Sequence, residues 1–228
     1  MQPYFLPYIG YYQLISAVDT FVVLDDVNYI NRGWINRNNI LSQGHPRLIT
    51  IPLNGASQNR KINDIMIIAD DSWKRQLARH VESAYRKAPC FEAVFSLFDA
   101  ILRSGEKYIS KLALLSLKTI CEYLSIDTIF TDSTAIYDNS HLRSSTRIVD
   151  ICVRERATTY INVIGGKELY TTDEFRAVNV SLRFLNPTLS PYRQFHNDFV
   201  RGLSILDVLM FNPPDEARAL LLNYTLIA

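Results

Sequence analysis

The chain has 228 residues, of which 48% are hydrophobic and 21% charged, and its formal net charge is +1. These values are typical of a globular protein that can bury a sizeable core, here as one domain over residues 1–228. The near-zero charge excludes a general attraction to nucleic acid or anionic lipid. No apolar run approaches the roughly 20 residues that a membrane span requires.

The first residues combine a turn, a helix and a buried strand. Pro3 and Pro7 disfavour helix before Tyr8, because the residue preceding a proline is pushed to extended geometry. Apolar residues recur at helical spacing after Gly10, and residues 20–24 form a continuous apolar run, which predicts a buried parallel strand. An α/β domain with such a loop-to-helix turn normally has a strand before it. We therefore expect either a sheet that lost its first strand or a shortened start.

Strands and helices alternate along the rest of the chain. Residues 72–124 carry three successive helical stripes, opened by Ser72 as the expected N-cap, and predict a helical subdomain or insertion. The expected fold is α/β, with a mainly parallel sheet flanked by helices. The other predicted strands are 48–53, 62–68, 128–130, 159–164 and 180–185, and the other predicted helices are 146–156, 203–211 and a final one after Pro213-Pro214.

Cysteine and histidine usage argues against metal or disulfide chemistry. Cys90, Cys121 and Cys152 are widely spaced and form no C-x-x-C pair, so a disulfide framework or a zinc site is not expected and a reducing cytoplasm fits best. The four histidines show no metal-ligand spacing. We therefore predict no metal site, and the residues indicate neither a cofactor nor an oligomeric state.

Six motifs, in this order, are similar to those of one known family. They are QPYFLPYIGY at 2–11, LDDV at 24–27, GWINRN at 33–38, RIVDIC at 147–152, YIN at 160–162 with glycines at 165–166, and LSILDVLMFN at 203–212. On these motifs, which span nearly the whole chain, the sequence resembles the WbqC-like family. The resemblance implies a cytoplasmic protein of bacterial O-antigen or other surface-polysaccharide biosynthesis, and it does not fix the reaction.

The opening turn also has a looser likeness. Tyr8-Ile9-Gly10-Tyr11 stands where nucleotidylyltransferase-like folds carry His-x-Gly-His at a turn that opens a helix. Both histidines of that pattern are tyrosines here, so the triphosphate chemistry that they support is not expected even if the fold is related.

The same turn is a candidate binding site. Gly10 lets the backbone approach a ligand, and the helix N-terminus behind it favours an anion. Gln2, Tyr8 and Tyr11 would line the pocket, with a tyrosine hydroxyl as a proton donor. The alternative is a tight strand-to-helix turn whose tyrosines pack in the core.

Asp25 and Asp26 are the candidate catalytic carboxylates. They close a buried strand, and ligands of α/β sheets collect at the carboxyl ends of strands. Alternation along the strand sends the two side chains to opposite faces, so one is expected to point into the crevice as a general base, a Mg²⁺ ligand or a partner of a sugar hydroxyl. The alternative is an Asx-turn that leaves the strand.

The segment 33–38 carries the groups that a sugar pocket uses. Sugar rings stack on tryptophan, as on Trp34, while the amides of Asn36 and Asn38 suit vicinal hydroxyls and Arg37 suits phosphate. The alternative is a loop anchored by Trp34 with a solvated arginine.

Residues further along the chain are candidates for an opposite wall. Arg147 and Asp150 lie three positions apart on a predicted helix, and Asn162 ends a strand before two glycines. The alternatives are a surface ion ladder with Arg154, worth about 0.2–0.5 kcal/mol per pair, and an ordinary glycine turn. Ser204 and Asp207 have capping-box spacing, which we interpret as structural, although Asp207 is a further candidate for this wall.

The sequence thus predicts an enzyme that modifies a sugar or a nucleotide-linked sugar by group transfer. Asp25 or Asp26 would be the general base and Arg147 the anion clamp. The transferred group is an acyl or aminoacyl unit on an amino sugar in one version, but no residue selects it. Two alternatives stay open, a non-catalytic sugar-nucleotide binding or scaffold protein and a nucleotidylyltransferase-like enzyme with an altered motif. The expected partner in each case is a small molecule, not a nucleic acid.

Overall fold

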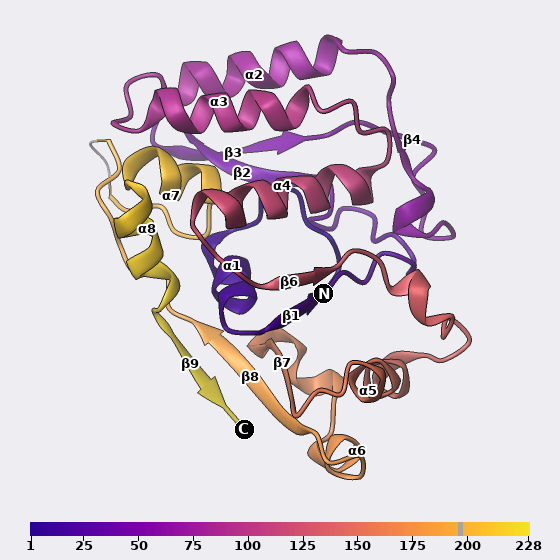
Figure 1. Cartoon of the computed structure of the whole chain (residues 1–228). Coiled ribbons are helices and arrows are strands. Elements are labelled where there is room, and N and C mark those ends of the chain that lie inside the picture. Colours follow the sequence, from indigo (N-terminus) through magenta and orange to yellow (C-terminus); the bar gives the residue numbers. More distant parts are fainter. Residues whose placement is uncertain (196–197) are drawn as a thin grey trace.

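The computed structural model describes residues 1–195 and 198–228 as a mixed α/β fold (Figure 1). Three short 3-10 turns are η1 (Ile62–Asp64), η2 (Thr134–Tyr137) and η3 (Ile164–Leu169). The α-helices are α1 (Ile9–Ser16), α2 (Ser72–Tyr85), α3 (Phe91–Leu102), α4 (Ile109–Tyr123), α5 (Ser144–Arg154), α6 (Thr172–Arg176), α7 (Ile205–Phe211) and α8 (Pro214–Leu221). The strands are β1 (Thr20–Val22), β2 (Arg37–Ser42), β3 (His45–Thr50), β4 (Leu53–Asn54), β5 (Met66–Ile67), β6 (Ile129–Thr131), β7 (Thr159–Val163), β8 (Ser181–Pro187) and β9 (Tyr224–Ile227).

The strands form small sheets that are only partly parallel. β1 pairs in parallel with β6 and β7 with β8, whereas β2–β3, β4–β5 and β8–β9 are antiparallel. The expectation of a mainly parallel sheet is therefore not confirmed. One reason is local: Gln43 and Gly44 both have positive φ, the geometry of a two-residue hairpin turn, so residues 37–50 fold back on themselves as β2 and β3.

A second reason is that the two parallel pairs belong to separate sheets, and a groove of about 510 Å³ is lined by residues of both β1 and β7. Its lining mixes polar and apolar side chains and comes partly from both flanking helices, for example Leu14 of α1 and Ile151 of α5. At one end Met1 adds to the edge of β1: its amino group donates to the Val22 carbonyl at 2.8 Å, and Leu24 N–H donates to the Met1 carbonyl at 2.8 Å. This pairing brings Gln2 to the same sheet edge as Asp25.

The helical block expected at residues 72–124 is present as α2, α3 and α4, which lie in layers beside the β2–β3 hairpin (Figure 1). Each presents an apolar stripe to the main core, with Tyr85 and Phe98 fully buried. The predicted N-cap is wrong by one residue. Ser72 is the first residue of α2, and the Asp70 carboxylate accepts its N–H at 2.9 Å.

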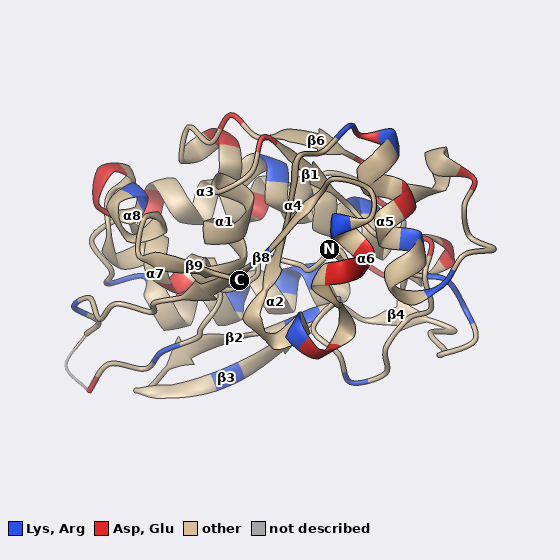
Figure 2. Cartoon of the chain, turned by 90° about the horizontal axis from the view of Figure 1, so that it is seen from below, with Lys and Arg blue, Asp and Glu red and all other residues tan. Residues whose placement is uncertain are grey.

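The carboxyl-terminal part forms the other end of the molecule, where α5 and α6 lie beside the sheet of β7, β8 and β9 (Figure 1). A second, smaller core of Cys152, Phe175 and Phe184 lies here. Basic and acidic residues are interspersed over α5 and α6 (Figure 2). In residues 1–195 and 198–228, every helix is too short or too polar to cross a membrane.

Candidate functional site

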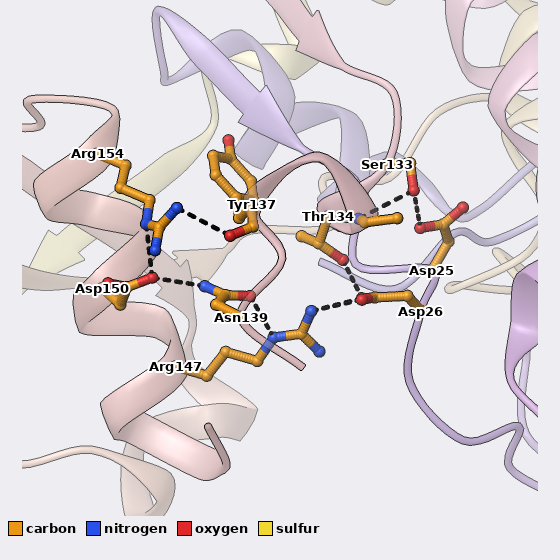
Figure 3. A network of polar contacts seen from close by, with 10 residues as sticks. Asp25, Asp26, Ser133, Thr134, Tyr137, Asn139, Arg147, Asp150 and Arg154 are labelled. Atoms are coloured by element: carbon orange, nitrogen blue, oxygen red, sulfur yellow. Dashed lines mark hydrogen bonds and ion pairs between the residues drawn. The ribbon is translucent and has the colours of Figure 1, made fainter. Parts of the chain in front are cut away.

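Asp25 and Asp26 are held by the turn that follows the neighbouring parallel strand. Val23 N–H donates to the Thr131 carbonyl and Thr134 N–H donates to the Val23 carbonyl, so the ends of β1 and β6 stay side by side. The turn η2 begins there. Its N-cap Ser133 donates to Asp25 Oδ1 at 2.6 Å, and the Thr134 hydroxyl donates to Asp26 Oδ1 (Figure 3). Both carboxylates are therefore fixed at the carboxyl end of β1.

Asp26 forms a buried ion pair with Arg147 of α5. The Arg147 Nη2 atom lies 2.6 Å from Asp26 Oδ2 and 2.7 Å from Asp26 Oδ1. The two side chains are only 7% and 5% exposed, for Arg147 and Asp26 respectively. An ion pair withdrawn from water in this way fixes both partners, because separating them leaves a buried charge without a counter-charge.

A chain of hydrogen bonds continues this pair along α5 (Figure 3). Arg147 Nε donates to Asn139 Oδ1 at 2.9 Å, and Asn139 Nδ2 donates to Asp150 Oδ2 at 2.7 Å. Asp150 also pairs with Arg154 Nε at 2.9 Å. The ion ladder that helical spacing suggested thus exists only for Asp150 and Arg154, while Arg147 turns away from it to Asp26.

The two adjacent carboxylates have pKa values displaced in opposite directions. Burial raises the pKa of Asp25, and the Ser133 hydrogen bond only partly offsets that rise. Burial acts in the same sense on Asp26, but the hydrogen bonds from Arg147 and Thr134 and the charge of Arg147 outweigh it and hold its pKa below the usual value. Neighbouring carboxyls pushed apart in this way suit different roles, one gaining a proton readily and the other staying ionised.

The opening turn forms a wall beside the carboxylates. Tyr11 is buried and its hydroxyl donates to the Gln2 carbonyl at 2.6 Å, so it holds the segment that pairs with β1. Burial raises the pKa of Tyr11, which keeps that hydroxyl protonated at neutral pH. Phe5 N–H donates to the Ile35 carbonyl, and the Tyr4 ring lies 6.2 Å from the Trp34 ring.

Trp34 is the most open aromatic residue of this wall. Its side chain is 48% exposed, and the Arg37 guanidinium carbon lies 5.6 Å from its ring centre. Arg37 Nε also donates to the Gly33 carbonyl at 2.6 Å, so the arginine is held against the indole. An exposed indole that is fixed by its neighbours offers a flat face for a ring-shaped ligand.

Gly10 has a packing role inside α1. A β-carbon at this position would lie 2.3 Å from the Tyr8 ring, so the glycine makes room for that half-buried tyrosine. Tyr8 in turn forms a β-bridge with Ser204. The structure thus supplies a local reason for the glycine that differs from the expected approach of a ligand to its backbone.

Three amides that the sequence placed in the pocket are engaged within the fold. Asn36 accepts from Tyr29 and donates to the Ile51 carbonyl, both at 2.8 Å. Asn38 donates to the Leu6 carbonyl at 2.5 Å and accepts from Asn39 N–H. Asn38 thus holds β2 against the opening turn, while Asn36 joins Tyr29 to the end of β3, and in each carboxamide both ends are satisfied by protein groups.

Asn162 is engaged in the same way at the end of β7. It donates to the Tyr160 hydroxyl at 3.1 Å and accepts from Val163 N–H at 2.7 Å. Asp207 is fully buried and accepts hydrogen bonds from Tyr85, Tyr192 and Gln194. It lies on α7, on the opposite side of the molecule from α5 (Figures 1 and 2), so it does not form the opposite wall. Ser204 is the N-cap of α7, but it accepts from Leu206 N–H and its own N–H donates to the Asn39 carbonyl, so the capping box with Asp207 is not formed.

Sequence reasoning missed Ser133, Thr134 and Asn139, which fix the carboxylates and Arg147. The available signal was their position. Ser133 and Thr134 closely follow the strand predicted at 128–130, and polar residues at the carboxyl ends of parallel strands are candidates to lie near a site at the end of a neighbouring strand. Within the described ranges, His, Cys, Asp and Glu side chains do not gather in threes with metal-binding geometry.

Comparison with known proteins gives two matches. The family model described as "WbqC-like protein family" matches residues 2–219. "Uncharacterized protein Rv1507c" of Mycobacterium tuberculosis is 29% identical over 221 residues, which cover 95% of this chain and 94% of that protein. No solved structure matches the chain.

Proposed function

The chain belongs to the WbqC-like protein family, and from this membership and the geometry at the end of β1 we propose that it is an enzyme of surface-polysaccharide (O-antigen) biosynthesis. Its substrate is a sugar or a nucleotide-linked sugar, and the reaction is a group transfer. The observation that supports this proposal best is the unequal carboxylate pair, with the Asp25 pKa raised and the Asp26 pKa lowered beside an arginine.

In the proposed reaction Asp25 is the general base. A hydroxyl or amino group of the acceptor sugar forms a bond to an acyl or aminoacyl group while the bond from that group to its carrier breaks. The carrier leaves with the electron pair of the broken bond, and Asp25 takes the proton that the acceptor loses. Asp26 stays ionised against Arg147 and keeps that end of the site rigid. In this proposal Tyr11 is the proton donor to the leaving group, for which its hydroxyl must exchange the Gln2 carbonyl for that group.

The wall formed by the opening turn binds the substrate in this proposal. Trp34 offers its face to the sugar or base ring, and Arg37 beside it attracts phosphate. Gln2 and Tyr8 extend the same wall. Among the described residues all three cysteines are free thiols, which suits the reducing cytoplasm where we place the reaction.

Mass spectrometry tests the proposal directly. The protein is incubated with a panel of nucleotide-linked amino sugars and acyl or aminoacyl donors, and products are identified by their mass increase. Asp25→Asn is expected to slow turnover by about 10²–10⁴-fold. The matched control is Asp132→Asn, an exposed carboxylate just before η2 that pairs with Lys118. Full turnover by Asp25→Asn would show that Asp25 is not the base.

A second candidate is a non-catalytic sugar-nucleotide binding protein of the same pathway. The observation that favours it is that the Asp25 carboxylate is shielded from solvent, since Asp25 is only 2% exposed and is already hydrogen-bonded to Ser133. Calorimetric titration of the same panel separates the two candidates. Measurable binding without any mass change in the products would favour the binding protein.

A further inference from the structure

The turn η1 lies directly against the carboxylate segment. Asn63 N–H donates to the Asp25 carbonyl at 3.0 Å, and Ile62 N–H donates to the Val27 carbonyl at 2.9 Å. Asn28 and Lys61 form an antiparallel bridge one step further along. These three contacts fix the position of Asn63 next to Asp25 through the main chain, independently of what its side chain does.

The side chain of Asn63 differs from the other amides near the site. Its Oδ1 atom is buried and has no hydrogen-bond partner among the described residues. The carboxamides of Asn36, Asn38, Asn139 and Asn162 are all engaged by protein groups. Of these five asparagines, the one beside Asp25 is thus the one whose buried acceptor has no partner among the described residues.

A second buried oxygen without a partner belongs to the adjoining segment. Ser110 lies in the first turn of α4, is 1% exposed, and its hydroxyl has no partner in the described part of the chain. Ile109 N–H donates to the Ile65 carbonyl at 3.1 Å, which joins this turn to the end of η1. Two of the unpartnered polar atoms therefore occur on η1, which contacts Asp25, and on the helical turn that η1 contacts.

An unpartnered buried acceptor weakens the folded state unless something donates to it. Asn63 Oδ1 accepts only, so its missing partner is an O–H or N–H group. The general base needs the same kind of group, because it removes a proton from a hydroxyl or an amine. A hydroxyl group could not satisfy both requirements, since its single proton would already point at Asn63 Oδ1, whereas a neutral amino group has one N–H for Asn63 Oδ1 and another for Asp25.

We propose that Asn63 Oδ1 accepts one N–H of the acceptor sugar's amino group, from which Asp25 removes another proton as the new bond to the transferred group forms. This inference rests on the proposed function and narrows its substrate to an acceptor that presents an amino group at this point. Asn63 orients the group through a hydrogen bond and takes no part in the proton transfer.

Asn63→Ala separates this role from a structural one. Its thermal unfolding temperature is expected to equal or exceed that of the unmodified protein, since removing an unsatisfied acceptor takes nothing from the fold. Asn36→Ala is the matched control and is expected to unfold at a clearly lower temperature, because it breaks the bonds to Tyr29 and Ile51. The Michaelis constant for the acceptor should rise roughly tenfold in Asn63→Ala, and that for the donor should not change.

Two results would overturn the inference. One is an unfolding temperature of Asn63→Ala that falls as far as that of Asn36→Ala, which would assign the amide to the fold. The other is an unchanged affinity for the acceptor, measured by titration calorimetry with the same nucleotide-linked amino sugars. Neither result depends on Asp25→Asn, whose undiminished turnover would contradict the proposed function and leave the Asn63 measurements as they are.

Discussion

Arg147 Nη2 lies 2.6 Å from Asp26 Oδ2, and this contact joins residues that are 121 positions apart in the sequence. It ties the first half of α5 to the carboxyl end of β1, so the carboxylate pair has its geometry only when the two halves of the chain have come together. The same contact gives the two aspartates different pKa values, because it keeps Asp26 ionised beside Asp25.

Removing the arginine should destabilise the fold strongly. Arg147→Leu leaves the Asp26 carboxylate buried without its counter-charge, and we expect the free energy of unfolding to fall by about 3–5 kcal/mol. Urea denaturation measures this change in unfolding free energy. Arg176→Ala is the control, since its pair with Asp173 is largely exposed and should be worth about 0.2–1 kcal/mol. Equal losses of unfolding free energy in the two variants would mean that the buried pair stabilises the fold no more than an exposed pair does.

The ion pair should also give stability a defined pH dependence. The pKa of Asp26 is lower in the folded protein than in the unfolded chain, so its contribution is fully present above about pH 4 and is lost as the pH falls further. The difference in unfolding free energy between the unmodified protein and Asp26→Asn should therefore shrink from pH 6 towards pH 3. A difference that stays constant or widens over this range would contradict the lowered pKa.

Ser133 should set the pKa of Asp25, the proposed general base. Burial raises the pKa of Asp25 and the Ser133 hydrogen bond lowers it, so Ser133→Ala removes the opposing effect and raises the pKa further. Because the base acts when ionised, the acidic limb of the pH–rate profile should move to higher pH. Ser104→Ala, at an exposed position, should leave the profile in place. A shift to lower pH, or none, would argue against Asp25 as the titrating group.

Trp34 should contribute to binding more than to stability. Its indole is 48% exposed, so Trp34→Ala should reduce the affinity for nucleotide-linked sugars roughly tenfold while changing the unfolding free energy by less than about 1.5 kcal/mol. The chain has two tryptophans, so in Trp73→Phe the remaining indole reports ligand binding by its fluorescence. Unaltered emission at saturating ligand would place the ring outside the binding wall.

The sequence by itself determined the elements whose signals are local. The helical block at 72–124 follows from apolar stripes at helical spacing. The position of Asp25 and Asp26 after a strand follows from an apolar run that stops there. Helix α5 begins at Ser144, two residues before its predicted start. The hairpin β2–β3 was missed because Arg37 and the asparagines after it are polar and resemble a loop, although their backbone groups pair as a strand.

Only the tertiary structure decided which polar groups are available and which are occupied. A side-chain amide has the same chemistry at Asn36 and at Asn63, yet the first is satisfied by Tyr29 and Ile51 and the second keeps a buried oxygen without a partner. Arg147 could have paired with Asp150 on its own helix and instead reaches Asp26. The choice of a hydrogen-bond partner depends on what lies nearby in space, and for these groups the partner comes from a distant part of the chain.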